Sequence, residues 1–325
     1  MNRSTLPPTR DDIAATAGRL PSLVLRTPCV PSPWLSALTG ADVRLKLEMI
    51  QPTGSFKIRG AVNALAALRT SRPNVTRVVT ASAGNHGQAV ALAARHAGVR
   101  VRVWVPASAP AAKRDAMRRL GAEVLEVESY DAAEHAALAA AGEDDDVYVP
   151  PYNDAHVIAG AGTVGLEILA DVPETNAILV PLGGGGLLSG IGIVAKAAGH
   201  HVLVIGTEAD ASPVFTRSLS AGRIVAVDVQ PTLADGLAGN LEPGSMTFDL
   251  VRRVCDRVVA VNEQAIAAAM ADLIRHERLV VEGASATAVA ALRVMSREDL
   301  ASRVVVVVLS GRNVDSTVIR RVLDS

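Results

Sequence analysis

Lys57 is the residue of this chain whose type and setting most strongly indicate chemistry. It lies in the stretch 51–61, Gln-Pro-Thr-Gly-Ser-Phe-Lys-Ile-Arg-Gly-Ala, in which a proline and a glycine interrupt the preceding strand. We expect Thr53 or Ser55 to cap a helix that runs to Leu68. Lys57 would then stand in the first turn of that helix.

One face of this predicted helix is apolar. The positions three and four residues onward from Lys57 hold small and then large apolar side chains: Ala61, Ala64, Leu65 and Leu68. Arg59, Asn63 and Thr70 fall on other faces, so the side chain of Lys57 is expected to point toward the core. A partly desolvated ammonium at the positive end of a helix dipole has a lowered pKa, and the neutral amine is what a Schiff-base nucleophile requires. The alternative is a lysine whose stem packs while its ammonium reaches solvent.

The composition indicates a globular protein whose partners are small molecules. Of the 325 residues 49% are apolar, and the net charge is -1, which gives no electrostatic case for nucleic acid or a membrane surface. Cys29 and Cys255 form no disulfide or metal framework and are typical of a reducing cytoplasm. The first 20 residues lack the apolar run of a secretory signal. The uncharged stretch 177–195 holds a proline and six glycines, so we expect a strand, turn and helix there and no membrane span.

Strands and helices alternate along most of the chain, which predicts an α/β fold with parallel sheets and helices on their faces. The predicted strands are 42–48, 77–81, 100–105, 123–127, 177–181, 201–206 and 303–309. The predicted helices, besides the one near Lys57, are 11–19, 85–97, 110–120, 130–141, 155–170, 187–198, 262–276 and 283–296. Five consecutive valines in the last strand indicate burial on both faces. The acidic run 142–146 is expected to be a solvated loop.

The run of four glycines at 183–186 lies between a predicted buried strand and a helix. Backbone N–H groups of such a run converge on an anion at the helix N-terminus, so the run predicts a phosphate cradle. A turn required only for tight packing is the simplest alternative. A dinucleotide fingerprint is another: Glu208 ends the next strand about where a ribose-binding acid belongs, but Leu188 stands where the third glycine should be. The chain has no nucleoside-triphosphate loop of the Gly-x-x-x-x-Gly-Lys type.

Two further segments place polar groups at the carboxyl ends of predicted strands. The segment 82–87, Ser-Ala-Gly-Asn-His-Gly, joins a strand to a helix, and its free N–H groups suit a carboxylate or another anion. Helix capping by Ser82 or Asn85 explains the same residues. Ser310 follows the valine strand, at the edge where ligands gather in parallel sheets. A lone serine there means little, and what matters is that these segments occur together with Lys57 and the glycines in one chain.

Taken together, these segments resemble those of the fold-type II pyridoxal-phosphate enzymes, in particular the threonine/serine dehydratase and serine racemase group. The resemblance covers about residues 11–315 and includes the stretches 232–238 and 280–284. It implies two parallel-type α/β domains of the tryptophan-synthase-β-like fold with pyridoxal 5'-phosphate between them. The large cofactor-binding domain would comprise 1–50 and 147–325, and the small domain, with the reactive lysine and the carboxylate loop, 51–146.

The resemblance also implies a role for each motif residue. Lys57 would carry the cofactor as a Schiff base and act as the catalytic residue. The other residues that would bind the cofactor are Phe56 against the ring, Asn85 at the ring hydroxyl, Gly183, Gly184, Gly185 and Gly186 at the phosphate, and Ser310 at the pyridine nitrogen. The residues that would hold the substrate carboxylate are Ser82, Ala83, Gly84, Asn85 and His86.

Three positions depart from the pattern of the group. Glu208 matches an acid that helps to bind a divalent cation in some members, but Val214 replaces the second acid, so a metal site is not expected. Arg312 stands where threonine dehydratases commonly have glycine, and it resembles the hydroxyectoine-utilisation dehydratases. Ala83 replaces the serine with which serine racemases reprotonate the opposite face of the substrate, which favours a lyase.

The resulting expectation is a cytoplasmic homodimer or homotetramer that dehydrates a β-hydroxy amino acid, L-threonine first and L-serine second, and releases ammonia. Lys57, once displaced by the substrate amine, would remove the Cα proton. The alternatives are another β-hydroxy amino acid (hydroxyectoine-derived, phenylserine or hydroxyaspartate), serine racemisation and, more remotely, an NAD-dependent oxidoreductase or a cofactor-free binding protein. Nothing after Ser325 could form the regulatory segment with which biosynthetic threonine dehydratases sense isoleucine, so isoleucine is not expected to inhibit.

Overall fold

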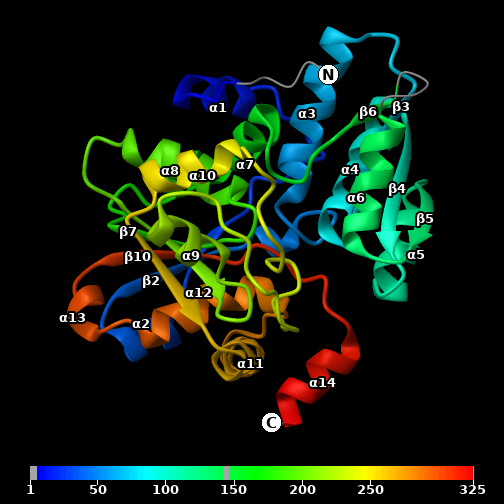
Figure 1. The fold of residues 1–325 in the computed structure, drawn as a ribbon. Helices are drawn as coiled ribbons and strands as arrows, with labels where there is room; N and C mark the ends of the chain where they lie inside the picture. The colour runs from blue at the N-terminus through cyan, green and yellow to red at the C-terminus, as the bar shows by residue number, and fades with distance from the viewer. Residues whose placement is uncertain (1–5, 142–145, 325) are drawn as a thin grey trace.

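The protein contains two β-sheets, as seen in a computed structural model that describes residues 6–141 and 146–324 (Figure 1). The larger sheet has six strands in the order β1-β2-β10-β7-β8-β9, and the smaller sheet has four in the order β5-β4-β3-β6. Every pair is parallel except β1 with β2. The strands are β1 Cys29–Pro31, β2 Asp42–Lys46, β3 Arg77–Ala81, β4 Arg100–Pro106, β5 Glu123–Val127, β6 Val147–Tyr148, β7 Ala177–Pro181, β8 Leu203–Ala209, β9 Arg257–Val261 and β10 Val304–Val308. The predicted α/β class with parallel sheets is confirmed.

Helices cover both faces of each sheet (Figure 1). They are α1 Arg10–Ala17, α2 Pro33–Thr39, α3 Lys57–Ser71, α4 Asn85–Ala97, α5 Ala111–Arg119, α6 Tyr130–Ala140, α7 Ala155–Asp171, α8 Gly186–Lys196, α9 Val214–Ala221, α10 Met246–Val254, α11 Glu263–Asp272, α12 Gly283–Val294, α13 Arg297–Leu300 and α14 Ser316–Asp324, with short 3-10 and π-helical turns at Glu48–Ile50 and Leu273–Glu277. In the part of the chain that the structure describes, no helix is long and apolar enough to cross a membrane.

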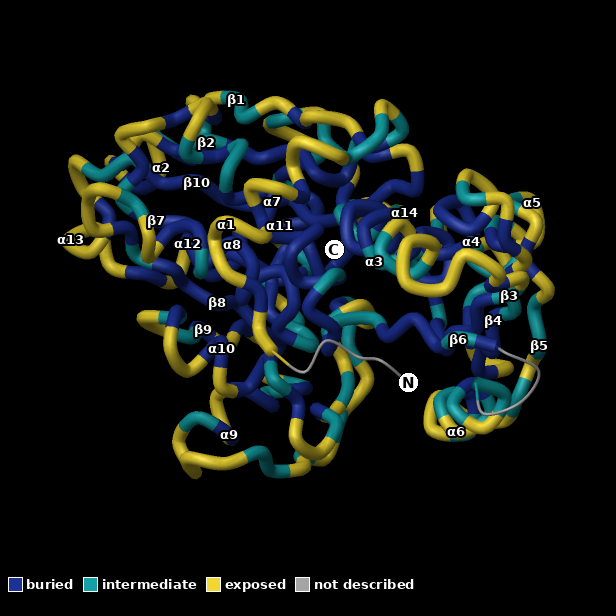
Figure 2. The backbone as a smooth tube through the Cα atoms, turned by 90° about the horizontal axis from the view of Figure 1, so that it is seen from above, coloured by how far each residue is buried: buried dark blue, intermediate teal, exposed yellow. Residues whose placement is uncertain are grey.

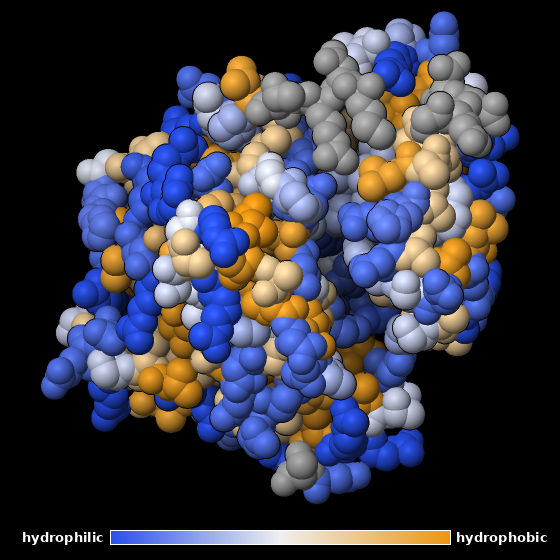
Figure 3. All heavy atoms as spheres, in the orientation of Figure 1, coloured by the Kyte–Doolittle hydropathy of each residue, from blue (hydrophilic) through white to orange (hydrophobic). Residues whose placement is uncertain are grey.

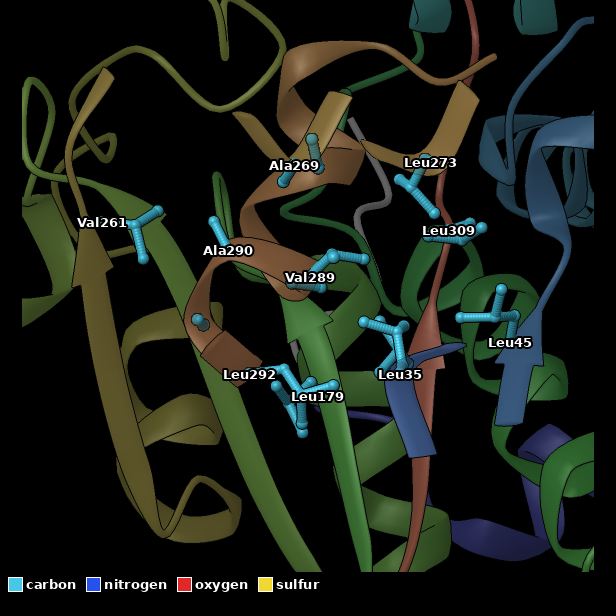
Figure 4. Close-up of a cluster of buried hydrophobic side chains, with 14 of the residues drawn as sticks. Leu35, Leu45, Leu179, Val261, Ala269, Leu273, Val289, Ala290, Leu292 and Leu309 are labelled. Atoms are coloured by element: carbon cyan, nitrogen blue, oxygen red, sulfur yellow. The ribbon is translucent and has the colours of Figure 1, made fainter. Parts of the chain in front are cut away.

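The central parallel strands of the larger sheet are buried on both faces, and the hydrophobic core lies on both sides of that sheet. Val305 to Val308 in β10 are fully buried, as the valine run predicts. On one face of the larger sheet, side chains from β7, α2, α11 and α12 pack together, including Leu35, Leu179 and Val289 (Figure 4). Another cluster fills the opposite face against α7, α8 and α10. The buried segments run through the centres of both parts of the molecule, and exposed segments lie outside them (Figure 2).

Helix α3 connects the two parts of the molecule. It packs against α7 of the larger part and against α4 of the smaller part. Lys57 is its first residue, as predicted, but the predicted caps are wrong: Phe56 is the N-cap, and no side chain caps the helix. The hydroxyls of Thr53 and Ser55 are instead buried without a hydrogen-bond partner among the described residues.

Helix α3 is buried on more than its apolar face. Ala61 and Leu65 are buried as expected, and Arg59 and Asn63, which lie on another face, are buried too, with exposed fractions of 0% and 1%. The second face is buried because α3 has packing partners on two sides, which a single apolar stripe does not reveal. Asn63 donates a hydrogen bond from Nδ2 to the carbonyl of His156 in α7, 2.7 Å away.

Arg59 lies in a buried ionic cluster that holds α3 in place. Its guanidinium contacts Glu48 at 2.7 Å and Glu167 of α7 at 2.7 Å, and Lys46 of β2 contacts Glu167 at 2.6 Å. Burial by itself would raise the pKa of Glu48, but the adjacent Arg59 holds it below its usual value. Two cations and two carboxylates therefore compensate one another, and the cluster joins β2, α3 and α7.

Residues 147 and 148 belong to the smaller sheet, although the predicted domain boundary placed them in the larger domain. Val147 and Tyr148 form β6, which pairs with β3 in the smaller sheet, although the sequence placed them with the larger part. The pairing is short and occurs where the chain returns from α6, so strand propensity alone could not assign it to either sheet. The predicted loop at 142–146 lies outside the described residues except for Asp146, which is buried and contacts Arg77 at 2.6 Å.

Candidate active site

A cavity of about 190 Å³ lies between the two parts of the molecule. A hollow between these parts is visible on the face shown in Figure 3. The smaller part supplies α3, α4, α5 and α6 to its wall, and the larger part supplies the carboxyl ends of β7 and β10. The sequence-predicted residues that line it are Phe56, Lys57, Ser82, Ala83, Gly84, Asn85, His86, Gly183, Gly184, Gly185, Gly186 and Ser310. Segments that are far apart in the sequence thus meet in one place.

Lys57 places its amine in this cavity. Nζ donates a hydrogen bond to the carbonyl of Pro151 at 2.7 Å and lies 5.3 Å from the centre of the Phe56 ring. Burial lowers the pKa of Lys57 to about 8, and the nearby Glu282 carboxylate opposes part of that change. About one tenth of this lysine is therefore the neutral amine at pH 7, far more than for an ordinary lysine, and this is the form that attacks a carbonyl carbon.

Lys57 also differs from the three other lysines of the chain. Lys46 contacts Glu167 at 2.6 Å, Lys113 contacts Asp235 at 2.7 Å, and Lys196 contacts Asp256 at 2.5 Å. Those carboxylates stabilise the ammonium form of each partner. Among the described residues, Lys57 alone of the four forms no ion pair with a carboxylate, and its amine donates to a neutral carbonyl.

The four glycines form the turn between β7 and α8. Gly185 has φ +84°, a left-handed conformation that side chains rarely adopt. A Cβ on Gly184 would lie 2.2 Å from a ring carbon of Tyr152, and one on Gly183 would lie 3.0 Å from the Cα of Leu237. Only a bare backbone fits here, and the N–H groups at the start of α8 are left for an anion in the cavity.

The second anion-binding candidate is the loop 82–86 between β3 and α4. Ser82 Oγ accepts hydrogen bonds from the N–H groups of Gly84 at 3.1 Å and Gly87 at 2.9 Å. The N-cap of α4 is Gly84, which has no side chain to make a capping bond. The Ser82 hydroxyl caps the first turn of α4 instead, because it accepts the N–H of Gly87. Ser82 therefore braces the loop, and Ala83 faces the same cavity with only a methyl group.

His86 and Asn85 have different surroundings within this loop. His86 is buried, its Nε2 lies 3.0 Å from the carbonyl of Val149, and burial lowers its pKa to about 3. The imidazole is neutral at physiological pH, and a carbonyl partner requires the hydrogen on Nε2. Asn85 Nδ2 donates to Glu282 Oε1 at 2.7 Å, and its Oδ1 accepts from Asn313 Nδ2 at 2.6 Å.

Ser310 follows β10 and is buried, with 4% of its surface exposed. Its carbonyl accepts a hydrogen bond from the N–H of Phe56 at 3.0 Å. Ser55 pairs with Gly311 in an isolated antiparallel bridge. The end of β10 and the start of α3 are therefore joined by backbone contacts, which bring the Ser310 hydroxyl and Lys57 to the same cavity.

Sequence reasoning missed several residues of the cavity wall: Lys113, Tyr130, Tyr152, Asp235 and Glu282. Glu282 had a usable signal, because it is an acid between two valines and the start of a buried helix, where an unpaired carboxylate is rare. Lys113 and Asp235 come from opposite parts of the molecule, and their contact has no local sequence signature. Tyr130 and Tyr152 are single aromatic residues at ordinary helix and loop positions.

Glu208 has its partners at the start of α9. Its Oε1 and Oε2 accept hydrogen bonds from the N–H groups of Thr216 at 2.9 Å and Phe215 at 3.1 Å, at the start of α9. Burial raises the pKa of this carboxyl. The described residues contain no group of three or more His, Cys, Asp and Glu side chains that could hold a metal ion. Each oxygen of the Glu208 carboxylate thus accepts one N–H at the positive end of α9.

The donor set of the cavity fits pyridoxal phosphate. A carbonyl-bearing cofactor needs a neutral amine, which Lys57 provides, and a phosphate needs a cradle of backbone N–H groups, which the glycine turn provides. A buried hydroxyl at Ser310 and an amide at Asn85 add polar partners for an aromatic ring with nitrogen and oxygen substituents. This is the class of site that fold-type II pyridoxal-phosphate enzymes build between two α/β domains.

Comparisons with known proteins agree with this class. Residues 20–311 match the family of pyridoxal-phosphate dependent enzymes. The chain is 44% identical over 317 residues to the L-threonine ammonia-lyase of Thermotoga maritima, which covers 97% of this chain and 78% of that protein.

Solved structures also resemble it closely. Maize serine racemase superposes with a TM-score of 0.89 at 33% identity, over 97% of each chain. The processed form of threonine deaminase isoform 2 from Solanum lycopersicum superposes with a TM-score of 0.89 at 31% identity, over 98% of this chain and 94% of that one.

The chain therefore belongs to the pyridoxal-phosphate dependent enzymes. Its cofactor is pyridoxal 5'-phosphate, and the fold-type II architecture predicted from the motifs is confirmed. The alternatives of an NAD-dependent oxidoreductase and of a cofactor-free protein are wrong, because the glycine turn lies in a pyridoxal-phosphate fold.

Proposed function

We propose that this protein is an ammonia-lyase that dehydrates L-threonine to 2-oxobutanoate and L-serine to pyruvate, with release of ammonia. The observation that carries the proposal is the Lys57 amine, which has no ion pair with a carboxylate of the described chain. It lies in a cavity that is also lined by the glycine turn 183–186 and by the loop 82–86. The relatives add support, because a protein 44% identical over 97% of this chain is named L-threonine ammonia-lyase.

The bound cofactor supplies an electron sink for the carbanion that forms at the substrate Cα. Lys57 has two tasks: its neutral amine binds the cofactor, and after the substrate amine has replaced it, Nζ accepts the Cα proton. The pKa of about 8 suits both tasks, because a general base works best when its pKa lies near the operating pH.

The remaining residues bind the cofactor and orient its ring. Gly183 to Gly186 hold the phosphate through backbone N–H groups at the start of α8. Phe56 would lie against the cofactor ring, Ser310 would meet the pyridine nitrogen and Asn85 would meet the ring hydroxyl. A neutral hydroxyl at the ring nitrogen leaves that nitrogen unprotonated, which favours prompt loss of the β-hydroxyl over transamination.

The substrate carboxylate lies on the loop from Ser82 to His86. The residues at the start of α4 offer backbone N–H groups there, and Ser82 Oγ braces the turn through Gly84 and Gly87. The neutral His86 anchors the loop to the carbonyl of Val149. This arrangement fixes the carboxylate and leaves Cα accessible to Lys57.

Elimination, and not racemisation, is the reaction that Ala83 favours. Racemisation requires an acid on the face of the carbanion opposite Lys57, and the methyl group of Ala83 donates no proton. The expected products from L-serine are pyruvate and ammonia with little D-serine.

Three further features complete the proposal. The enzyme works in the cytoplasm as a homodimer or homotetramer. Its large domain comprises residues 1–50 and 147–325 and its small domain comprises 51–146, except that β6 at 147–148 pairs with β3 of the small domain. A comparison of kcat/KM values measures the substrate preference. The candidate substrates are L-threonine, L-serine, phenylserine, hydroxyaspartate and hydroxyectoine-derived amino acids.

The test combines absorbance, covalent labelling and turnover. Addition of pyridoxal phosphate to cofactor-free protein is expected to produce a visible absorption band, and borohydride followed by peptide mapping is expected to label Lys57. Lys57→Ala should abolish the band and turnover. Lys113→Ala is the matched control, because Lys113 lies in the same cavity and its loss should leave the label on Lys57. A label on Lys46, Lys113 or Lys196 in the unmodified protein would refute the assignment.

A further inference from the structure

Glu282 is a buried carboxylate of the cavity that the roles above do not use. It precedes α12, 3% of its surface is exposed, and its side chain makes no capping hydrogen bond to that helix. An acid at this position ordinarily turns back onto the first free N–H groups of its own helix. Here the side chain turns into the cavity instead.

Gly311 makes room for this carboxylate, because a Cβ at that position would lie 2.3 Å from Oε1 of Glu282. The N–H of Glu282 also donates to the carbonyl of Gly311 at 3.1 Å. The carboxylate is therefore held directly beside Ser310 at the end of β10.

Glu282 and Asn313 hold the amide of Asn85 between them. Asn85 Nδ2 donates to Glu282 Oε1 at 2.7 Å, and Asn85 Oδ1 accepts from Asn313 Nδ2 at 2.6 Å. Asn313 Nδ2 also donates to the carbonyl of Thr53 at 2.8 Å. The bonds from Asn313 to Asn85 and from Asn85 to Glu282 run in one direction, and this chain of bonds ends at the carboxylate.

This direction fixes which way the Asn85 amide faces. If the amide were turned by 180°, its oxygen would face the acceptor oxygen of Glu282, and its NH₂ would face the NH₂ of Asn313. Both contacts would be repulsive, because an ionised carboxylate only accepts hydrogen bonds. One N–H of Asn85 is used by Glu282, so the second N–H is the one left for a ligand.

We propose that Glu282 is a positioning residue, which orients Asn85 so that an N–H donor faces the ring hydroxyl of the cofactor. The proposal rests on the contact between Asn85 and the cofactor that was proposed above. A donor at this position favours the deprotonated ring oxygen, because a hydrogen bond to a charged acceptor is stronger than one to a neutral acceptor. Glu282 thereby sets the ionisation state of the ring without touching the reacting atoms.

The charges around Glu282 agree with such a role. Burial raises its pKa to about 7, Lys113 of α5 and the N–H of Asn313 lower it, and Asp235 raises it. Lys57 faces it across the cavity. The carboxylate form, which only accepts, therefore prevails above neutral pH, where an eliminating enzyme needs its base unprotonated.

The test measures the absorption spectrum of the cofactor-bound enzyme. A lysine-bound pyridoxal cofactor absorbs in the visible when its ring oxygen is deprotonated and in the near ultraviolet when that oxygen carries a proton. Glu282→Gln keeps the size of the side chain but can present a donor or an acceptor, so it no longer selects one orientation of Asn85. We expect the ratio of visible to near-ultraviolet absorbance at pH 8 to fall about tenfold, the effect of a charged hydrogen bond worth about 1.4 kcal/mol.

Two further variants make the result decisive. Glu282→Asp keeps the charge, but its shorter side chain moves the carboxylate away from Asn85 by the length of one methylene. The absorbance ratio is expected to fall by the same factor as in Glu282→Gln. Asp235→Asn is the matched control, because it removes a negative charge from the same cavity wall without a bond to Asn85, and its absorbance ratio should stay at the unmodified value.

The outcomes separate this inference from the proposed function. If unmodified protein gives no visible band and borohydride leaves Lys57 unlabelled, the proposed function fails. If Lys57 is labelled but neither Glu282 variant changes the absorbance ratio, the positioning role of Glu282 is wrong. An equal fall in Asp235→Asn would also overturn it, because the effect would then come from charge and not from the orientation of Asn85.

Discussion

Gly184→Ala tests the cradle of glycines most directly. The added Cβ would lie 2.2, 2.3 and 2.8 Å from three ring carbons of Tyr152, whereas non-bonded carbons normally stay about 3.5–4.0 Å apart. The ring or the turn must therefore move by more than about 1 Å. Overpacking of this kind costs about 1–3 kcal/mol. Binding of pyridoxal phosphate requires the turn in its original position, so the same cost is set against binding, and the dissociation constant for the cofactor is expected to rise about 5- to 150-fold.

The cause can be isolated with a double-mutant cycle. Tyr152→Ala removes the ring that the new methyl group would strike, so Gly184→Ala should cost much less in that background. Gly199→Ala is the matched control, because a Cβ on Gly199 would meet nothing within 4 Å, and its cofactor affinity should equal that of the unmodified protein.

The assay is an absorbance titration of cofactor-free protein with pyridoxal phosphate, together with urea unfolding of each variant. Gly184→Ala should weaken cofactor binding when Tyr152 is present, and at least half of that loss in free energy should be recovered when Tyr152→Ala is combined with it. An equal loss in both backgrounds would show that the ring is not the obstacle. No loss in either would show that residue 184 does not approach the cofactor.

Four further predictions follow from individual side chains. The rate of cofactor capture by Lys57 should rise about tenfold per pH unit below pH 8 and level off above it, because its lowered pKa makes deprotonation limiting; stopped-flow absorbance measures it, and a flat profile from pH 6 to 9 would contradict it. Chelators should leave turnover unchanged, and Glu208→Gln should destabilise the protein by about 1 kcal/mol through the lost cap of α9 in urea unfolding; inactivation by a chelator that is reversed by a divalent cation would contradict this. Ala83→Ser should raise the share of D-serine formed from L-serine, measured by chiral chromatography, and D-serine forming as fast as pyruvate in the unmodified protein would refute the role of Ala83. Arg59→Met should destabilise by about 3–5 kcal/mol, because Glu48 is left buried without its partner; urea unfolding measures it, and a loss below about 1 kcal/mol would show that the ion pair is not needed.

The local elements and the motifs were determined by the sequence itself. The valine run marked β10 as a strand buried on both faces, and the glycines at 183–186 marked the turn from β7 to α8. Both signals are short-range: side-chain branching sets the strand, and the missing Cβ sets the turn. Lys57 was predictable for the same reason, because its first-turn position and its apolar stripe lie within one helix.

Some elements had no such local signal. The two-residue strand β6 and the strand β9 at Arg257–Val261 were not predicted. The hydrogen bonds of a strand are made with a neighbour elsewhere in the chain, so strand propensity alone could not decide them. The helix predicted at 262–276 was correct, but its π-helical turn at Leu273–Glu277 was not foreseen. The caps of α3 were predicted wrongly because Thr53 and Ser55 are buried by packing and do not turn back onto the helix.

The partners of the site residues were decided only by the tertiary structure. Asn85 meets Glu282 across 197 positions of sequence, and Lys113 meets Asp235 across 122. Arg59 is buried because α3 lies between α4 and α7, an arrangement that the pattern of α3 alone does not contain. The physical reason is the same in each case: a side chain's pKa and orientation depend on the charges and donors within a few ångströms, and which groups those are is settled by how the two sheets pack together.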